Sequence, residues 1–312
     1  MKHFFINILI ILFFFILLIF PEIVFDGASS GLLLWFNIVL PTLLPFLIIS
    51  GILINTSAIH ILVKCTSPVF CRLFRVSEYG SFAVLCGFLC GYPMGGKITS
   101  DLLHSERITL TEAKYLLSFC NNTSPMFIIS FVMHQNLHAS HLIFPALGIL
   151  FLSPVLCSFL FRHFYPLSYR PDYISHHKPS VNQKKLSKSN LLDDCIMNSF
   201  ETITKIGGYI IMFSICTHLV SALPFTHTIF DLILLPFLEI TNGVLSLSQS
   251  LISFQDKFVI VLALVSFGGW CSVAQTKCMI SDAGIPLLPY VIEKLITAMV
   301  TSLLATFFFQ LY

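Results

Sequence analysis

Hydrophobic residues along the chain gather into long runs that are separated by short polar stretches. A helix that crosses a bilayer needs about 20 mainly apolar residues. The runs that reach or approach this length predict membrane-spanning helices at residues 4–25, 31–54, 119–137, 141–162, 206–223, 229–250 and 287–311. Two shorter runs, 81–98 and 258–276, are interrupted by glycine and polar residues, which predicts helices that break within the membrane.

Two further helices are predicted outside these runs. The stretch 58–76 mixes three basic side chains with apolar residues, so we expect it to lie along the membrane interface. Thr109 and Glu112 have the spacing of a capping box. They predict a short amphipathic helix over 105–118 on the cytoplasmic face.

Composition makes the membrane assignment firm. Hydrophobic residues are 56% of the chain and charged residues only 10%, whereas a soluble domain has about 25% charged residues. We therefore expect an integral membrane protein, which excludes a nucleic-acid binder, a secreted disulfide scaffold and a soluble dinucleotide-binding enzyme. The ten cysteines form no Cys-x-x-Cys pair and lie mostly in apolar runs, so packing is favoured over metal or redox chemistry.

Basic residues indicate the orientation. Residues 162–188 contain six Lys or Arg and a single acid, so the positive-inside rule places this stretch in the cytoplasm. The loops near 26–30, 134–141 and 224–230 contain no Lys or Arg, which favours the outside. The chain then divides into an N-terminal transmembrane helix (1–30), a first membrane repeat (31–165), a basic cytoplasmic linker (166–190) and a second membrane repeat (191–312).

A short sequence recurs in the two halves. Leu-Leu-Pro-Phe-Leu at residues 43–47 reappears at residues 234–238, and a glycine-rich polar element follows each copy. Chance recurrence in so apolar a chain is the alternative to a duplication. Duplicated halves with broken helices are typical of secondary transporters. The number of predicted spans does not decide whether the halves are parallel or inverted.

Glycine-rich sequence at membrane depth needs a structural reason, because lipid cannot satisfy free backbone groups. Residues 91–96, Gly-Tyr-Pro-Met-Gly-Gly, therefore predict the tip of a re-entrant hairpin, with a helix N-terminus near Lys97 that suits an anionic group. The alternative is a helix crossing packed through small residues. Lys97 is expected to contact a carboxylate of the substrate, or else to extend to the cytoplasmic interface.

Polar side chains inside other apolar runs extend this candidate site. Residues 121–124 predict a polar wall, although helix capping explains one or two of them. Glu239 is expected either to bind a coupling cation or proton, or to hold a helix contact. The candidate substrate-binding residues are Gly91, Gly95, Gly96, Lys97, Asn121, Asn122, Thr123, Ser124, Glu239, Thr241, Asn242, Gly268, Gly269, Ser272 and Gln275.

Other chemistries find little support in the sequence. His134, His138 and His141 have helical spacing, but no carboxylate or thiolate lies near them in the sequence, so they are interpreted as loop residues rather than metal ligands. The chain contains no Ser-His-Asp arrangement, P-loop, His-Glu-x-x-His or paired-acid motif. We expect neither an enzyme nor a bound cofactor or metal.

Together, residues 91–97, 121–125, 238–243 and 267–275 resemble the motifs of the YlbJ family of sporulation integral membrane proteins. That family belongs to the nucleoside-recognition, or Gate, domain group, which is similar to concentrative nucleoside transporters. The resemblance implies an all-α polytopic membrane protein with two pseudo-symmetric halves and re-entrant helical hairpins. It also implies transport of dipicolinic acid across the outer forespore membrane by alternating access.

The residues give that implied substrate chemical sense. Dipicolinate is a small planar dianion, and Lys97, helix N-termini and amide or hydroxyl donors suit its carboxylates. A nucleoside or nucleobase transporter is the first alternative, and a neutral nucleoside would need no cation. A spore-envelope membrane scaffold without transport is the second. The bilayer is the one certain partner, and the sequence does not define an oligomeric state.

Overall fold

The computed structural model describes residues 2–166, 191–222 and 236–311, and within them every regular element is helical. The part before the linker forms α1 (Lys2–Ile19), α2 (Pro21–Leu34), η1 (Trp35–Val39), α3 (Leu40–Asn55), α4 (Ile59–Phe74), α5 (Glu78–Leu89), α6 (Met94–His104), α7 (Leu110–Cys120), η2 (Phe127–Asn136), η3 (Ser140–Leu142) and α8 (Ile143–Phe161). The later part forms α9 (Leu191–Ser221), α11 (Ile240–Gln249), α12 (Phe254–Phe267), α13 (Gly269–Ile280), η5 (Ser281–Ala283) and α14 (Leu287–Leu311).

Several predicted features fall outside the described residues. They are residues 167–190 of the basic linker, the loop 224–230, and Leu234 and Leu235 of the second repeat copy. The pseudo-symmetry of the two halves stays a prediction.

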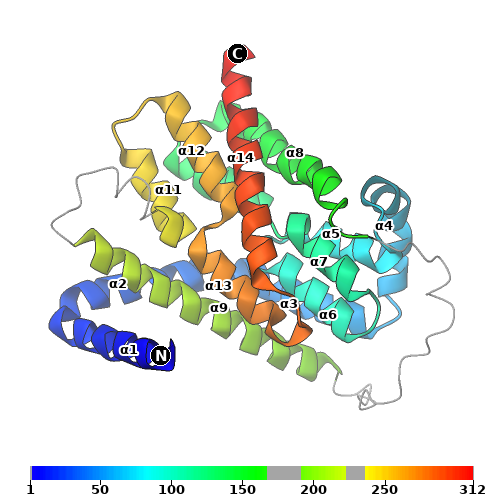
Figure 1. Cartoon of the computed structure of the whole chain (residues 1–312), viewed down its shortest axis with the longest axis horizontal. Coiled ribbons are helices and arrows are strands. Elements are labelled where there is room, and N and C mark those ends of the chain that lie inside the picture. Colours follow the sequence, from blue (N-terminus) through cyan, green and yellow to red (C-terminus); the bar gives the residue numbers. More distant parts are fainter. Residues whose placement is uncertain (1, 167–190, 223–235, 312) are drawn as a thin grey trace.

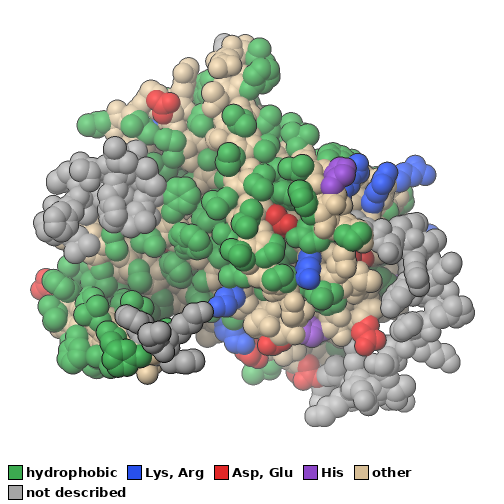
Figure 2. Space-filling model, viewed as in Figure 1, with side chains coloured by type: hydrophobic (Ala, Val, Ile, Leu, Met, Phe, Trp, Pro, Cys, Tyr) green, Lys and Arg blue, Asp and Glu red, His purple; other side chains and the backbone are tan. Residues whose placement is uncertain are grey.

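The chain is an all-α polytopic membrane protein, as predicted. Among the described residues, five helical stretches are long and apolar enough to cross a bilayer, at 21–55, 140–161, 191–221, 254–283 and 287–311. The face in Figure 2 is covered largely by hydrophobic side chains, and most of the few charged ones lie toward its lower edge and right-hand side. Such a surface suits lipid rather than water.

Helix α14 stands in the middle of the molecule, with α8 and α12 packed against it (Figure 1). Helices α2 and α3 pack on the long helix α9, and α5, α6 and α7 pack on one another. One buried cluster joins α3 to α7 with α9 and α14, and it includes Phe82, Tyr115 and Tyr290. A second lies between η2, α8, α11 and α12.

The N-terminal part corrects one prediction. We expected a loop at 26–30, but residues 21–55 form one helical stretch, and the chain breaks earlier, before Pro21. Gly27 and Gly31 lie against α9, where an added Cβ would approach the Cα atoms of Ile215 and Ile211 to 2.8 Å in each case. The small residues that resembled a loop therefore form a close helix contact of the Gly-x-x-x-Gly type.

The predicted helix breaks are confirmed. Helices α5 and α6 are joined by a turn at residues 90–93, and α12 gives way to α13 at Gly268, whose φ is 89°. At 1.5 Å per residue, α5 with its 12 residues and α6 with its 11 each reach across about half of a 30 Å hydrocarbon core. The pair therefore has the dimensions of a re-entrant hairpin. The predicted span 119–137 is also interrupted, because α7 ends at Cys120 and the chain is not helical at 121–124.

Helix α7 has the predicted N-terminal cap, but it lies in the core and not on the surface. Thr109 Oγ1 accepts a hydrogen bond from Glu112 N at 3.2 Å. The Glu112 carboxylate does not return to the cap; it accepts from Ser77 N at 2.6 Å and ties α7 to the start of α5. We expected an amphipathic surface helix, yet Tyr115 and Phe119 are buried in the core. The reason is that α7 forms the first half of the interrupted helix.

Helix α4 agrees with its predicted amphipathic character. Ile59, Val63 and Phe74 are buried, whereas the basic side chains Lys64 and Arg72 are exposed. Residues 206–221 of the predicted span 206–223 form the later part of α9, which begins at residue 191. The predicted span 229–250 is not a single helix within its described part, because the chain leaves helical geometry at Glu239.

Candidate substrate pocket

A central cavity of about 250 Å³ lies where the interrupted helices meet. Its walls come from the hairpin tip between α5 and α6, the break after α7, the start of α11 and the break between α12 and α13, together with parts of α3, η2 and α9. The predicted site residues that line it are Gly91, Thr123, Ser124, Glu239, Thr241, Gly268, Ser272 and Gln275.

The hairpin tip packs directly on the break after α7, because glycines allow the two backbones to approach. Gly91 has a φ of 89°, and a Cβ there would lie 2.8 Å from Ser124 N. A Cβ on Gly95 would lie 2.8 Å from Asn121 Cα. Gly95 and Gly96 do not line the pocket; they lie in the first turn of α6, behind the tip.

Side chains of the tip and of the α7 break bind the carbonyl groups at the end of α12. The Tyr92 hydroxyl lies 3.0 Å from Val265 O and 2.9 Å from Ser266 O, and Thr123 Oγ1 donates to Val265 O at 2.7 Å. Carbonyls in the last turn of a helix lack partners within that helix. The interruption at Gly268 thus joins the two parts of the chain at the pocket.

The second break presents a helix N-terminus to the pocket. Gly268 closes α12 in left-handed geometry, and α13 begins at Gly269 without a side-chain cap from the described residues. Cys271 and Ser272, in the first turn of α13, line the cavity. Free N–H groups and the positive end of the helix dipole favour an anionic group at this position.

Glu239 is a helix cap in the structure. Its side chain is 3% exposed, and its carboxylate accepts hydrogen bonds from Thr241 N at 3.0 Å and Asn242 N at 2.9 Å. This geometry fits the alternative that Glu239 holds a helix contact, and binding of a coupling ion stays a prediction. Asn242 and Gly269 do not line the pocket; Gly269 lies against the Phe237 carbonyl instead.

Asn121 and Asn122 are buried supports of the break rather than pocket lining. Asn121 Nδ2 donates to Thr276 Oγ1 and to Tyr290 Oη, both at 2.9 Å, and Asn121 Oδ1 accepts from Gly96 N at 3.3 Å. Asn122 Nδ2 donates to Phe119 O at 2.7 Å. Their polar groups are therefore used to fix non-helical backbone in a dry interior.

Lys294 of α14 is not among the site residues predicted from the sequence, yet it is only 1% exposed. Its Nζ donates to Asn121 O at 3.1 Å and to Asn122 Oδ1 at 3.2 Å, and it lies 5.2 Å from the centre of the Tyr92 ring. A signal was present, because Glu293 and Lys294 are adjacent charges within an apolar run, where ionisable residues tend to be functional.

Glu293 turns to a different partner. Its Oε1 accepts a hydrogen bond from Tyr165 Oη at 2.5 Å. Burial and then the Glu293 carboxylate raise the pKa of the Tyr165 hydroxyl above its usual range, so the phenol remains a donor. The two adjacent charges of α14 are thus held by separate parts of the molecule.

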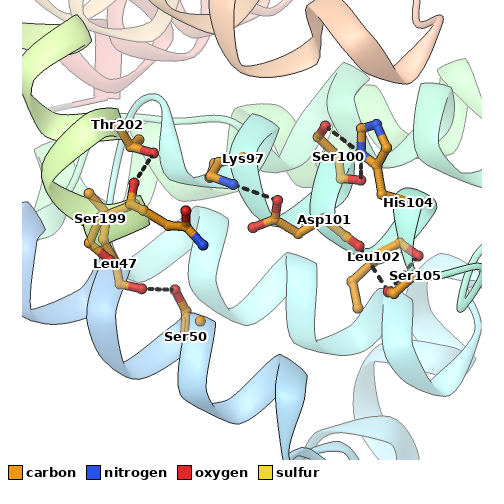
Figure 3. A network of polar contacts seen from close by, with 12 residues as sticks. Leu47, Ser50, Lys97, Ser100, Asp101, Leu102, His104, Ser105, Ser199 and Thr202 are labelled. Carbon is orange, nitrogen blue, oxygen red and sulfur yellow. Dashed lines mark hydrogen bonds and ion pairs between the residues drawn. The ribbon is translucent and has the colours of Figure 1, made fainter. Parts of the chain in front are cut away.

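A second cavity of about 450 Å³ lies between α3, α6, α9 and the end of α13, and Lys97 belongs to it. Lys97 Nζ is 2.5 Å from Asp101 Oδ1, one turn further along α6 (Figure 3). On α9, Lys205 pairs with Glu201 at 2.7 Å. The expected place of Lys97 beside the hairpin tip is wrong, because α6 begins at Met94 and carries Lys97 into the helix.

The two cavities follow one another along the same helices. On α3, Leu43 lines the central pocket and Leu47 lines the second cavity. On α13, Gln275 and Cys278 do the same. About one helical turn separates the two members of each pair.

The chain is 28% identical to the sporulation integral membrane protein YlbJ of Bacillus subtilis (strain 168), in an alignment that covers 88% of this chain and 75% of that relative. No protein-family model matches the chain. No solved structure matches it either.

Proposed function

Similarity to YlbJ over most of its length supports membership of this chain in the YlbJ family, and on that premise we propose that it transports a small planar anion, dipicolinic acid, across the outer forespore membrane. The observation that carries the proposal is the central pocket, at which a hairpin tip and two helix breaks meet. Secondary transporters bind their substrates at such discontinuous helices. No chemical reaction or cofactor is part of this proposal.

The pocket chemistry supports a planar anion. The N-terminus of α13 offers N–H donors, and Ser124 adds a hydroxyl to the same cavity. Thr123 and Ser272 also line it, and their hydroxyls donate to Val265 O and Gly269 O. Tyr92 also lines the pocket and adds an aromatic side chain to its wall. A cavity of about 250 Å³ suits a ligand of one aromatic ring with short substituents.

The arrangement of the two cavities supports alternating access. The second cavity is lined by Cys195 and Asn198, close to the start of α9 and hence to the basic linker. The positive-inside rule assigns that side to the cytoplasm. A route from the mother-cell cytoplasm would then pass the second cavity and reach the central pocket.

A nucleoside or nucleobase transporter is the second candidate, and the charge of the pocket favours it. Among the described residues that line the central pocket, none is Lys or Arg, and Glu239 is the charged one. A neutral nucleobase would need no cation and would stack on Tyr92. Uptake that is inhibited by uridine or adenosine but not by dipicolinate would select this candidate.

The test is the content and location of dipicolinic acid in sporulating cells that lack the protein. We expect the acid to be made and to remain in the mother cell, and the wild-type gene to restore its transfer. A Ser272→Ala variant should reduce the transfer, whereas Ser302→Ala, on the exposed side of α14, should not. Spores that fill normally without the protein would remove the dipicolinate assignment and leave the nucleoside and scaffold alternatives.

A further inference from the structure

Lys294 is a fully buried cation whose three N–H directions have partners. Two hydrogen bonds reach Asn121 O and Asn122 Oδ1, and the third side of the group faces the Tyr92 ring. Within the described residues no carboxylate lies within ion-pair distance of its Nζ; the recorded pairs there are Lys97–Asp101 and Lys205–Glu201. A lysine ammonium has three donors and no acceptor, and here its three directions meet two acceptor oxygens and the face of an aromatic ring.

The partners of Lys294 belong to the break after α7. Asn121 is the C-cap of that helix, so its carbonyl lies at the negative end of the helix dipole. Unwound carbonyls and helix C-terminal ends are the groups with which transporters coordinate a coupling Na⁺ or proton at a broken helix. The Lys294 ammonium thus occupies a position that has the chemistry of a monovalent cation site.

We propose that Lys294 is a resident cation that takes the place of a coupling Na⁺ at the break after α7. The side chain supplies, from α14, the charge that other interrupted helices receive from a bound ion. Two consequences follow. The protein as it stands gains nothing from Na⁺, and removal of the ammonium exposes a monovalent-cation site on Asn121 O and Asn122 Oδ1. Only the meaning for coupling rests on the proposed transport function; the site itself does not.

The test measures the melting temperature of the purified full-length protein in detergent, in NaCl, LiCl or choline chloride of equal ionic strength. We expect no difference between these salts for the wild type. We expect Lys294→Ala to melt at a lower temperature in choline chloride and to recover by about 2 °C or more in NaCl or LiCl, because a ligand of the folded state stabilises it. The control is Lys205→Ala, which removes an exposed, paired lysine and should show no salt preference.

Either variant or wild type can overturn the proposal. If the wild type melts at a higher temperature in Na⁺ than in choline, it has a separate ion site and the proposal fails. If Lys294→Ala folds and its melting temperature does not depend on Na⁺, the substitution has exposed no ion site and the proposal fails as well. If Lys294→Ala does not fold, Asn122→Asp replaces it, since the new carboxylate would lie about 3.2 Å from the ammonium. That variant should fold, and its melting temperature should be the same in Na⁺ and in choline. A melting temperature that depends on Na⁺ would contradict a resident cation. None of these readouts involves substrate, so failure here is distinct from failure of dipicolinate transport.

Discussion

Two glycines hold the pocket walls in a backbone geometry that other residues seldom adopt. Gly91 and Gly268 both have a φ of 89°. A Cβ on Gly91 would meet the backbone of Ser124 at 2.8 Å, and a Cβ on Gly268 would meet Ser272 Oγ at 2.5 Å. Each position therefore requires glycine for its conformation and for its contact.

Gly91→Ala should lower stability and transport together. Left-handed strain costs on the order of 1–3 kcal/mol, and the clash with Ser124 pushes the tip away from the break. The matched control is Gly148→Ala on α8, where an added Cβ meets nothing within 4 Å. Melting temperatures of the two purified variants check this, and equal melting temperatures would contradict the role given to the tip.

Two substitutions of Glu239 test its role as a helix cap. Glu239→Ala removes both bonds to the start of α11 and should cost about 1 kcal/mol, as lost N-caps do. Glu239→Gln keeps one acceptor oxygen but places an amide NH2 against the other backbone N–H, so it should lose part of that stability and less than Ala loses. Denaturation of both variants measures the difference. A Gln variant as stable as the wild type would contradict the role of both carboxylate oxygens in the cap.

At the scale of elements, the contact between α2 and α9 depends on small residues. Gly27 and Gly31 face the α9 backbone, and Gly207 of α9 lies against the Trp35 ring, whose Nε1 donates to Ile203 O at 2.9 Å. In a membrane the hydrophobic effect does not drive helices together, so close packing of this kind carries the association.

Gly31→Leu should therefore destabilise the α2–α9 pair, by about 1–3 kcal/mol for an overpacked contact. Gly208→Leu places the same side chain on α9, at a position where an added Cβ meets nothing within 4 Å. We expect a lower melting temperature for the first variant and an unchanged one for the second. Equal melting temperatures for the two variants would show that the glycine contact is not what holds α2 in place.

Sequence patterns predicted the helix breaks because glycine clusters interrupt otherwise continuous apolar runs at 91–96 and 268–269. The same reasoning produced a loop at 26–30 that does not exist, since small residues serve both turns and close helix contacts. The predicted position of Lys97 is wrong because α6 begins three residues earlier than expected, which turns the Lys97 side chain toward another cavity. The partners of Lys294 could not be predicted from the sequence, because they lie more than 170 residues away from it along the chain.

At the scale of the whole molecule, the two cavities in series indicate where the proposed transport route would open. The buried residues Leu43 and Leu47 lie one turn apart on α3 and face one cavity each. Movement of α3 against α9 and α13 would join the cavities, because those helices contribute to both.

Filling the second cavity should therefore block transport without removing the central pocket. Ser50 lines that cavity and is 8% exposed, whereas its neighbour Ile49 is 55% exposed and faces away from it. We expect Ser50→Trp to abolish substrate transfer in sporulating cells while the purified protein still shows substrate-induced thermal stabilisation. Ile49→Trp should keep both substrate transfer and substrate-induced stabilisation. Normal transfer by Ser50→Trp would mean that substrate does not pass through the second cavity, and loss of both binding and transfer would mean that the two cavities act as a single site.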